Sequence, residues 1–407
     1  EGGYRTGMRY DQIPNLADKM KEYLISTRRT LHRHPETSGN EEWTSIFLQN
    51  EIKDLGLPIE MVSKTGFIAT LDTGRPGPHI VLRADIDALP VMENEENLKR
   101  KKTCVSEISG GAHVCGHDAH MAMLLASMKL LVEDRENQSG IIYFCFEEGE
   151  ENACGIKGML DALSKRRVDT CWGIHVYAGL EADKICLEAG PRMSGAAETE
   201  LDVIGKGGHG SRPDMAVNPV FCAAAILTNL GVCWPNQITA GETVTLGITT
   251  IQGGEQRNII PDTATIKGTL RYFNAQEGEK ALELVRTVAE HTAAMNKCTV
   301  NFGPRFRIAC PPVVNDETCA EIAKEAVGRV LPKEKLVKCE PWYASDDFGM
   351  YLQRYPGIYA HLGLVNEEYG SGALHHNDHF DLDESIMTTG VKATLAYVKG
   401  VQEKYQN

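Results

Sequence analysis

The chain has 407 residues, of which 42% are hydrophobic and 24% are charged, and its formal net charge at pH 7 is −14. This composition predicts a globular protein of two or three domains, and we find no apolar run of about 18 residues that would predict a transmembrane helix. The acidic balance argues against nucleic acid and membrane surfaces as partners.

The first half of the chain alternates helical and strand patterns. Residues 14–34 carry apolar side chains at helical spacing and predict one helix. Short apolar runs predict buried strands at 79–85 and 140–146, with a strongly apolar helix between them at 121–134. A further strand is expected at 171–176. This alternation is typical of an α/β sheet.

The pattern changes in the middle of the chain, where two helices separate strands with period-two alternation. The expected elements are, in order, 199–204, 218–230, 244–251, 264–273, 277–295 and 298–302. The resulting order, βαββαβ, is ferredoxin-like. We therefore predict an α/β, mixed-sheet catalytic domain at 10–196 and 310–407, with an inserted ferredoxin-like lid or dimerisation domain at 197–309.

Twelve cysteines are scattered at uneven spacing without a Cys-x-x-Cys pair. The N-terminal stretch also lacks the apolar core of a signal peptide. Together these features predict reduced thiols and a cytoplasmic location. A redox role for Cys115 is disfavoured, because the nearest cysteine in sequence is Cys104.

The segment HVCGHDAH (113–120) holds a thiol, three imidazoles and a carboxylate around one glycine. Cys115 and His117, two residues apart, can face one metal ion, since thiolate and imidazole suit zinc or another borderline metal. Asp118 could orient an imidazole. The alternative is a helix N-terminus in which Gly-His-Asp acts only as a cap.

The segment FEEGEE (146–151) directly follows a predicted strand, so its carboxylates should stand at the carboxyl end of the sheet, where α/β sheets bind ligands. Of Glu150 and Glu151, one can bind metal while the other acts as general base. The alternative is a solvated acidic loop, and we expect Glu147 and Glu148 to be solvated.

Two later segments supply further histidines. His175 ends the strand at 171–176, although a histidine there can equally be a core residue. His375 belongs to ALHHNDHFDLDE (373–384), where we set His376 and His379 aside as non-ligands. Long gaps between ligands are normal for catalytic metal sites and unlike zinc fingers.

Asp85 and Asp87 stand at the end of the strand at 79–85. Both could orient histidine ligands of a metal ion. The alternative is a simple strand-to-turn transition ending at Pro90.

With these segments, the sequence resembles the aminoacylase, hippurate hydrolase and indole-acetyl-amino-acid hydrolase family of metal-dependent amidohydrolases, within the aminoacylase-type metallopeptidases. The matching stretches span nearly the whole chain in order: RRTLHRHPETSGNEEWT (28–44), LRADIDALP (82–90), HVCGHDAH, FEEGEENACGIKGM (146–159), WGIHV (172–176), GKGGHGSRPD (205–214), NIIPD (258–262), SDDFG (345–349) and LHHNDHFDLDE (374–384).

The resemblance implies two divalent metal ions, zinc, manganese or cobalt. The residues that match the family's metal ligands are Cys115, His117, Glu151, His175 and His375.

The resemblance also implies catalytic roles. Glu150 matches the general base, and His209 matches a histidine that reaches the partner subunit's active site and steadies the oxyanion. Asp87 joins them as a carboxylate that orients a ligand. Asn258 and Arg271 match positions near the substrate's carboxylate or oxyanion, although Arg271 could equally be a strand residue in a surface ion pair.

Three stretches depart from the family's usual pattern. FEEGEE stands where FQPAEE is usual, GSRPD replaces an Ala-rich stretch, and SDDF replaces Ser-Glu-Asp-Phe. These departures leave the ligand positions intact and bear on substrate preference.

The resemblance therefore implies an enzyme, a metal-dependent amidohydrolase that splits N-acyl (acetyl, benzoyl or aryl) amino acids into a carboxylic acid and a free amino acid, and that forms a homodimer or higher homo-oligomer. Two alternatives remain: a dipeptidase or aminobenzoyl-glutamate hydrolase, and a non-catalytic metal-binding partner subunit.

Overall fold

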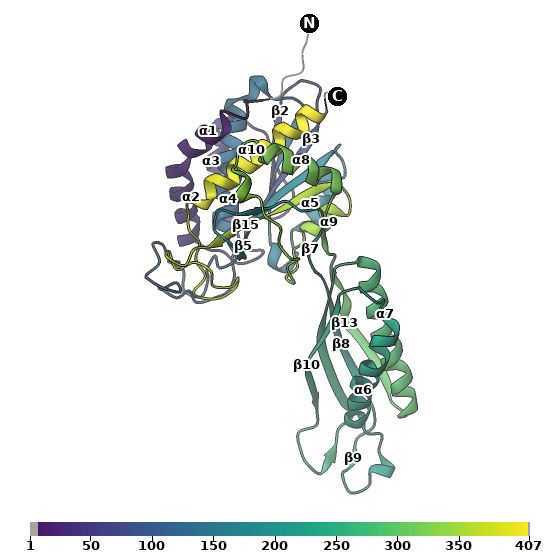
Figure 1. The fold of residues 1–407 in the computed structure, drawn as a ribbon. Coiled ribbons are helices and arrows are strands. Elements are labelled where there is room, and N and C mark those ends of the chain that lie inside the picture. The colour runs from purple at the N-terminus through teal and green to yellow at the C-terminus, as the bar shows by residue number, and fades with distance from the viewer. Residues whose placement is uncertain (1–6, 406–407) are drawn as a thin grey trace. The chain divides into compact units, whose positions relative to one another are not determined.

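A computed structural model describes residues 7–405, which form two compact units (Figure 1). The first unit holds the chain up to Gly190, Asn315–Glu340 and the chain from Tyr351 onward, and the second holds Pro191–Val314 and Pro341–Met350. Residues 406 and 407 of the predicted catalytic domain lie outside the described residues. The second unit thus takes in three short stretches that the prediction assigned to the catalytic domain, 191–196, 310–314 and 341–350.

The first unit is built on one seven-stranded mixed sheet. Its strands, in spatial order, are β1 (Ile59–Met61), β2 (Phe67–Asp72), β4 (Ile141–Glu147), β3 (His79–Asp85), β5 (Thr170–Glu181), β15 (Gly357–Val365) and β6 (Ile185–Cys186). The four central strands, β4, β3, β5 and β15, run parallel to one another, whereas β1, β2 and β6 pair antiparallel. The carboxyl ends of the central strands therefore meet at one edge, where α/β sheets bind ligands.

Helices pack on this sheet and enclose a continuous apolar core. They are α1 (Ile13–Lys19), α2 (Lys21–Arg33), α3 (Glu42–Ile52), α4 (His117–Glu133), α5 (Ile156–Leu163), α8 (Glu317–Val327) and α10 (Ile386–Lys404), with α9 (Phe348–Leu352) at the boundary between the units. Helix α4 packs against α2, α10 and β3. Its sequence is apolar on nearly every side because it is buried nearly all round.

Two helices of the first unit differ from those predicted. Where one helix was expected at 14–34, the chain forms α1 and α2, because the backbone turns at Met20, whose N–H closes α1 on Ala17 and Asp18. The apolar helix expected at 121–134 begins earlier, at His117. Its first turn is polar, so the apolar pattern alone did not reveal it.

The second unit contains an antiparallel sheet in the order β10-β12-β8-β13, with α6 and α7 on one face (Figure 1). Its elements are β7 (Gly190–Met193), β8 (Gly195–Ile204), β9 (Gly208–His209), α6 (Pro219–Gln237), β10 (Val244–Gly253), β11 (Ile259–Ile260), β12 (Thr263–Tyr272), α7 (Ala275–Met295), β13 (Thr299–Cys310) and β14 (Val313–Asn315). The βαββαβ order and this strand arrangement confirm the predicted ferredoxin-like fold.

No helix within residues 7–405 has both the length and the apolar content needed to cross a bilayer.

Candidate metal centre

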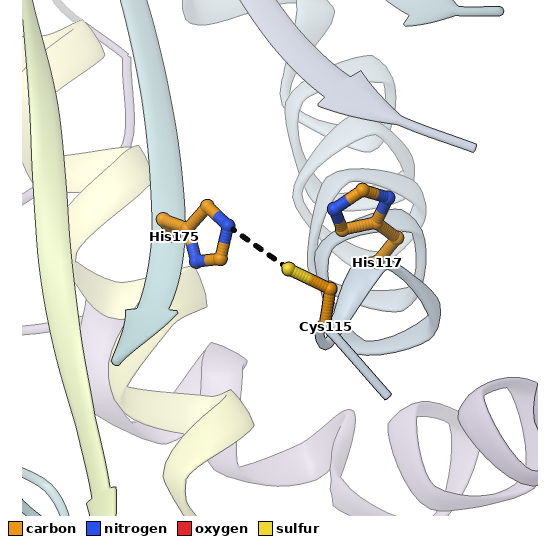
Figure 2. A group of neighbouring side chains, drawn as sticks. All are labelled: Cys115, His117 and His175. Atoms are coloured by element: carbon orange, nitrogen blue, oxygen red, sulfur yellow. Dashed lines mark hydrogen bonds between the residues drawn. The ribbon is translucent and has the colours of Figure 1, made fainter. Parts of the chain in front are cut away.

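The loop before α4 brings a thiol and an imidazole to the carboxyl edge of the sheet. Gly116 has a left-handed backbone (φ 98°), and a Cβ at this position would lie 2.2 Å from a methyl carbon of Val176. Only glycine fits such a close approach. The chain can therefore pass β5 closely enough to set Cys115 and His117 beside His175, as Figure 2 shows.

Cys115, His117 and His175 form a buried group whose potential ligand atoms all lie within 4.8 Å of one another. The Cys115 Sγ lies 3.7 Å from Nε2 of His175 (Figure 2). The Nδ1 of His175 donates to the Val176 carbonyl at 2.6 Å, which directs Nε2 toward the thiol. Such a backbone bond is how proteins commonly orient a histidine ligand.

His117 is oriented by Asp87. Its Nδ1 donates to the Asp87 carbonyl at 2.9 Å and to Oδ1 at 3.1 Å. The opposite nitrogen, Nε2, is buried and has no hydrogen-bond partner among the described residues. It faces carboxylate oxygens of Asp85 at 3.5 Å, Glu150 at 3.9 Å and Glu151 at 3.8 Å. A buried imidazole nitrogen left without a hydrogen bond is what a metal ion would satisfy.

Glu151 links Cys115 to a residue far along the chain. Its Oε1 lies 3.1 Å from Nε2 of His376, and Cys115, Glu151 and His376 form a second group of potential ligands within 4.8 Å of one another. His376 has a left-handed backbone (φ 70°). This conformation is uncommon outside glycine, and such strain concentrates at functional sites.

His375, the ligand predicted from this segment, faces the backbone. Its Nδ1 donates to the Cys115 carbonyl at 3.0 Å, and its Nε2 accepts from the N–H of Ala178 at 3.1 Å. The structure thus brings His376 to Glu151 and does not bring the ring nitrogens of His375 there. Neighbouring residues in an irregular loop project to different sides, and no pattern in HHNDH (375–379) predicts which imidazole faces the potential ligand group.

Glu150 stands beside the ligand groups, in the short 3-10 helix Glu150–Asn152 that follows β4. Its side chain is 8% exposed, and its carboxylate shares a group of potential ligands with Asp87 and His117. Asp87 holds this region together, because its Oδ2 accepts from the N–H of Glu151 at 2.9 Å and from the hydroxyl of Ser38 at 2.7 Å.

The remaining acidic residues of FEEGEE are not solvated as predicted. Glu147 is 0% exposed and Glu148 is 5% exposed. Glu147 accepts from Arg83 at 2.6 Å and from the hydroxyl of Tyr351 at 3.0 Å, and Glu148 accepts from the N–H of Thr65 at 3.2 Å. The prediction of solvated side chains was wrong because the end of β4 is covered on both faces.

Negative charge dominates the electrostatics of the group. Burial raises the pKa of the Cys115 thiol well above its usual value, and Glu151, Glu150 and Asp85 raise it further. Burial alone would lower the pKa of His117, but Asp85, Asp87 and Glu151 outweigh burial and raise it to about 10. Concentrated carboxylates in a buried site call for a cation, and a divalent ion would convert the thiol to a thiolate ligand. The thiol, imidazole and carboxylate donors fit zinc, manganese or cobalt.

Asp118 is engaged away from the ligands. Its Oδ2 accepts from Nε of Arg28 at 2.9 Å and from Nδ1 of His32 at 2.8 Å, and all three side chains are buried. Burial would raise the pKa of Asp118, but the charges on Arg28 and His32 hold it well below its usual range. The imidazole that Asp118 orients is therefore that of His32, and the first turn of α4 is anchored to α2.

Removing the cation of this buried pair should destabilise the first unit. We expect Arg28→Met to lower the free energy of unfolding by about 3–5 kcal/mol, because the buried carboxylates of Asp118 and Glu384 would both lose the guanidinium between them. Urea denaturation followed by circular dichroism measures the change. The control is Arg9→Met, whose ion pair with Asp11 is exposed and should be dispensable. Equal stability of the two variants would contradict this account.

The candidate residues of the second unit lie in two places, at the small β9-β11 sheet and on β12 of the four-stranded sheet. His209 is exposed in β9, which pairs with β11, and the Asn258 carbonyl accepts from the neighbouring Gly210 N–H at 2.8 Å. Arg271 lies near the carboxyl end of β12, the end farther from β11, and its Nη1 donates to the Ser345 hydroxyl at 3.1 Å. Burial lowers the pKa of the Arg271 guanidinium. The structure thus brings His209 and Asn258 close to each other, whereas Arg271 lies far from both.

The sequence matches the family model described as peptidase family M20/M25/M40 over residues 81–400. It is 32% identical to IAA-amino acid hydrolase ILR1-like 2 of Arabidopsis thaliana over 388 residues, covering 94% of this chain and 86% of that protein. It is also 32% identical to thermostable carboxypeptidase 1 of Saccharolobus solfataricus over 389 residues, covering 94% and 96%.

Among solved structures, the fold is similar to that of a protein from Bacillus subtilis described as a dinuclear metal-binding peptidase of the M20 family. The TM-score is 0.81 and the sequence identity 29%, and the similarity covers 95% of this chain and 99% of that chain.

Proposed function

The chain belongs to peptidase family M20/M25/M40 and is a metal-dependent, carboxypeptidase-like amidohydrolase, and from this premise we propose that it hydrolyses N-acyl amino acids to a carboxylic acid and a free amino acid. The observation that carries the proposal is the convergence of Cys115, His117 and His175 beside Glu151, with Glu150 next to them. Three distant stretches of sequence supply these residues, and no structural role requires them to meet.

Two divalent ions would be held by Cys115, His117, Glu151, His175 and His376. We propose His376 in the position first given to His375, because its Nε2 faces Glu151. When bound, such ions polarise the substrate's carbonyl group and lower the pKa of water toward neutrality.

Glu150 is the proposed general base. It takes a proton from the attacking water and later delivers that proton to the nitrogen of the leaving amino acid. Its carboxylate lies 3.9 Å from Nε2 of His117, so it stands beside the ligands, while Asp87 holds both His117 and the backbone of Glu151. The chain thereby fixes a carboxylate beside the metal ligands, where it can act as a base on the attacking water.

The substrate class is supported by the relatives' names. An IAA-amino acid hydrolase and a carboxypeptidase both cleave an amide bond on the acyl side of an amino acid, and both matches span most of this chain. We therefore place an amino acid with a free carboxylate on the leaving side of the bond.

The roles of His209, Asn258 and Arg271 stay proposals from the resemblance: His209 as the oxyanion's donor, and the other two as contacts of the substrate's carboxylate or oxyanion. About eight residues of β12 separate Arg271 from the His209 end of the sheet, a span of about 25 Å. A small substrate cannot contact both ends of one unit, so one of these assignments requires a second copy of the chain.

We also propose a homodimer or higher homo-oligomer in the cytoplasm. All twelve cysteines, which lie within the described residues, are free thiols. That agrees with a reducing compartment.

A substrate screen with defined metals tests the proposal. We expect protein loaded with Mn²⁺, Zn²⁺ or Co²⁺ to hydrolyse at least one of the N-acetyl, N-benzoyl or aminobenzoyl amino acids, and chelator treatment to reduce the rate by about a hundredfold or more until metal is restored. Mass spectrometry of the released amino acid measures turnover. Exclusive cleavage of dipeptides would favour the dipeptidase alternative, and full metal occupancy without any hydrolysis would favour a non-catalytic subunit.

A further inference from the structure

Glu41 is a buried carboxyl that the proposed chemistry does not use. It directly precedes α3 and is 0% exposed. One oxygen accepts from the N–H of Gly149 at 2.8 Å, and the other accepts from the hydroxyl of Thr65 at 3.2 Å. Gly149 immediately precedes Glu150, so a side chain more than a hundred residues away in sequence holds the backbone next to the proposed base.

We propose that Glu41 is a positioning residue for Glu150: it fixes the turn that directs the Glu150 carboxylate toward the metal ligands. This inference rests on the proposed function of Glu150. Glu41 contacts neither the ligand groups nor the reacting atoms, and it acts only through the Gly149 amide.

The turn at Gly149 needs an external support. Gly149 has a left-handed backbone (φ 61°), and a Cβ there would lie 2.1 Å from the Cys154 sulfur. Ala153, at the other end of the 3-10 helix Glu150–Asn152, is left-handed as well (φ 57°). Glycine adopts this conformation freely, but in a residue such as Ala153 it persists only where surrounding contacts determine it. A short segment with a flexible glycine at one end and a strained residue at the other depends on its hydrogen bonds for a single conformation.

Two carboxylates hold the backbone on either side of Glu150. Glu41 accepts from the N–H of Gly149, and Asp87 accepts from the N–H of Glu151 at 2.9 Å. With both bonds in place, the direction in which the Glu150 side chain leaves the backbone is determined. Without the first, the N–H of Gly149 loses its carboxylate acceptor, the turn is held less firmly, and the Glu150 carboxylate can move away from its 3.9 Å approach to His117.

The required property of Glu41 is an acceptor oxygen at the right place. Burial, together with the nearby charge of Asp87, raises the pKa of Glu41 to about 7. A carboxyl oxygen accepts a hydrogen bond in either protonation state, and so does the amide oxygen of glutamine. Leucine has a similar volume but accepts no hydrogen bond. Glutamine should therefore replace Glu41 and leucine should not.

The test compares Glu41→Leu and Glu41→Gln with Glu42→Gln, a control at the adjacent, exposed residue whose partner is Lys64. For any amide substrate that the wild type cleaves, we expect Glu41→Leu to lower kcat about tenfold to a hundredfold, because small misplacements of a catalytic group have effects of this size. In Glu41→Leu, KM should stay within about twofold of the wild-type value and the metal content should be unchanged. Glu41→Gln should retain at least about a fifth of the wild-type kcat, because the glutamine amide oxygen can still accept the hydrogen bond from Gly149, although from a slightly shifted position.

Hydrogen exchange of the Gly149 amide gives a readout that does not depend on activity. In the wild type this amide should exchange as slowly as the amides of β4, in Glu41→Gln it should stay protected, and in Glu41→Leu its exchange should accelerate about tenfold or more. If the wild type hydrolyses no amide substrate, the proposed function is refuted. The hydrogen-exchange comparison still tests whether Glu41 holds the Gly149 amide.

Three results would overturn the proposal: fast exchange of Gly149 in the wild type, a kcat of Glu41→Leu within twofold of the wild type, or equal losses in the leucine and glutamine variants. The first can be measured without any variant, so the proposal remains testable if Glu41→Leu does not fold.

Discussion

Glu150→Gln is expected to retain two bound metal ions while kcat for amide hydrolysis falls about a thousandfold. Glutamine has nearly the same shape as glutamate but cannot accept the proton of the attacking water, and general base catalysis contributes about 10²–10⁴-fold to a rate. Glu150 is 8% exposed and lies beside His117, so the amide should fit the same space. Steady-state kinetics together with elemental analysis of the same preparation measure both quantities.

The neighbouring glutamate supplies the matched comparison. Glu151 belongs to the ligand group with Cys115 and His376, so Glu151→Gln should lose metal and activity together. Near-normal turnover in Glu150→Gln would show that Glu150 is not the general base. A parallel loss of metal in that variant would make Glu150 a ligand instead.

His376→Ala is expected to weaken binding of one metal ion about a hundredfold or more, since a directly coordinating group should matter at least as much as the outer partners whose loss costs 10–100-fold. His375→Ala should have the smaller effect, because that ring bonds to the backbone of Cys115 and Ala178. Titration of metal-free protein with Zn²⁺ against a competing chelator measures both affinities. The reverse order would restore His375 as the ligand.

The sheet and its ligand-bearing edge could be predicted from the sequence because their pattern is local. The apolar run at 79–85 became β3 with the predicted bounds, and the run at 140–146 became β4 one residue later. Since β3 pairs in parallel with β4 on one side and with β5 on the other, residues near the carboxyl ends of these strands had to meet at one edge. The meeting of Glu151 and His175 follows from that topology, although β5 continues to Glu181 and His175 therefore lies within the strand, not at its end as predicted.

What the sequence did not reveal depends on tertiary contacts. The choice between His375 and His376 depends on a left-handed backbone at His376, and no local pattern specifies that conformation in a histidine. The burial of Glu147 depends on Arg83 and Tyr351, which approach from other strands and helices. The support that Glu41 gives to Gly149 joins residues too distant in sequence for any periodicity to connect them.

The central claim is that the five proposed ligand side chains converge on shared metal ions. The most direct measurement is an anomalous-difference map from crystals grown with Zn²⁺ or Mn²⁺. We predict two peaks, each about 2.0–2.3 Å from its ligand atoms, drawn from Cys115, His117, Glu151, His175 and His376. Glu150 should face the ions. Peaks at other residues, or none at this edge of the sheet in catalytically active protein, would contradict the account.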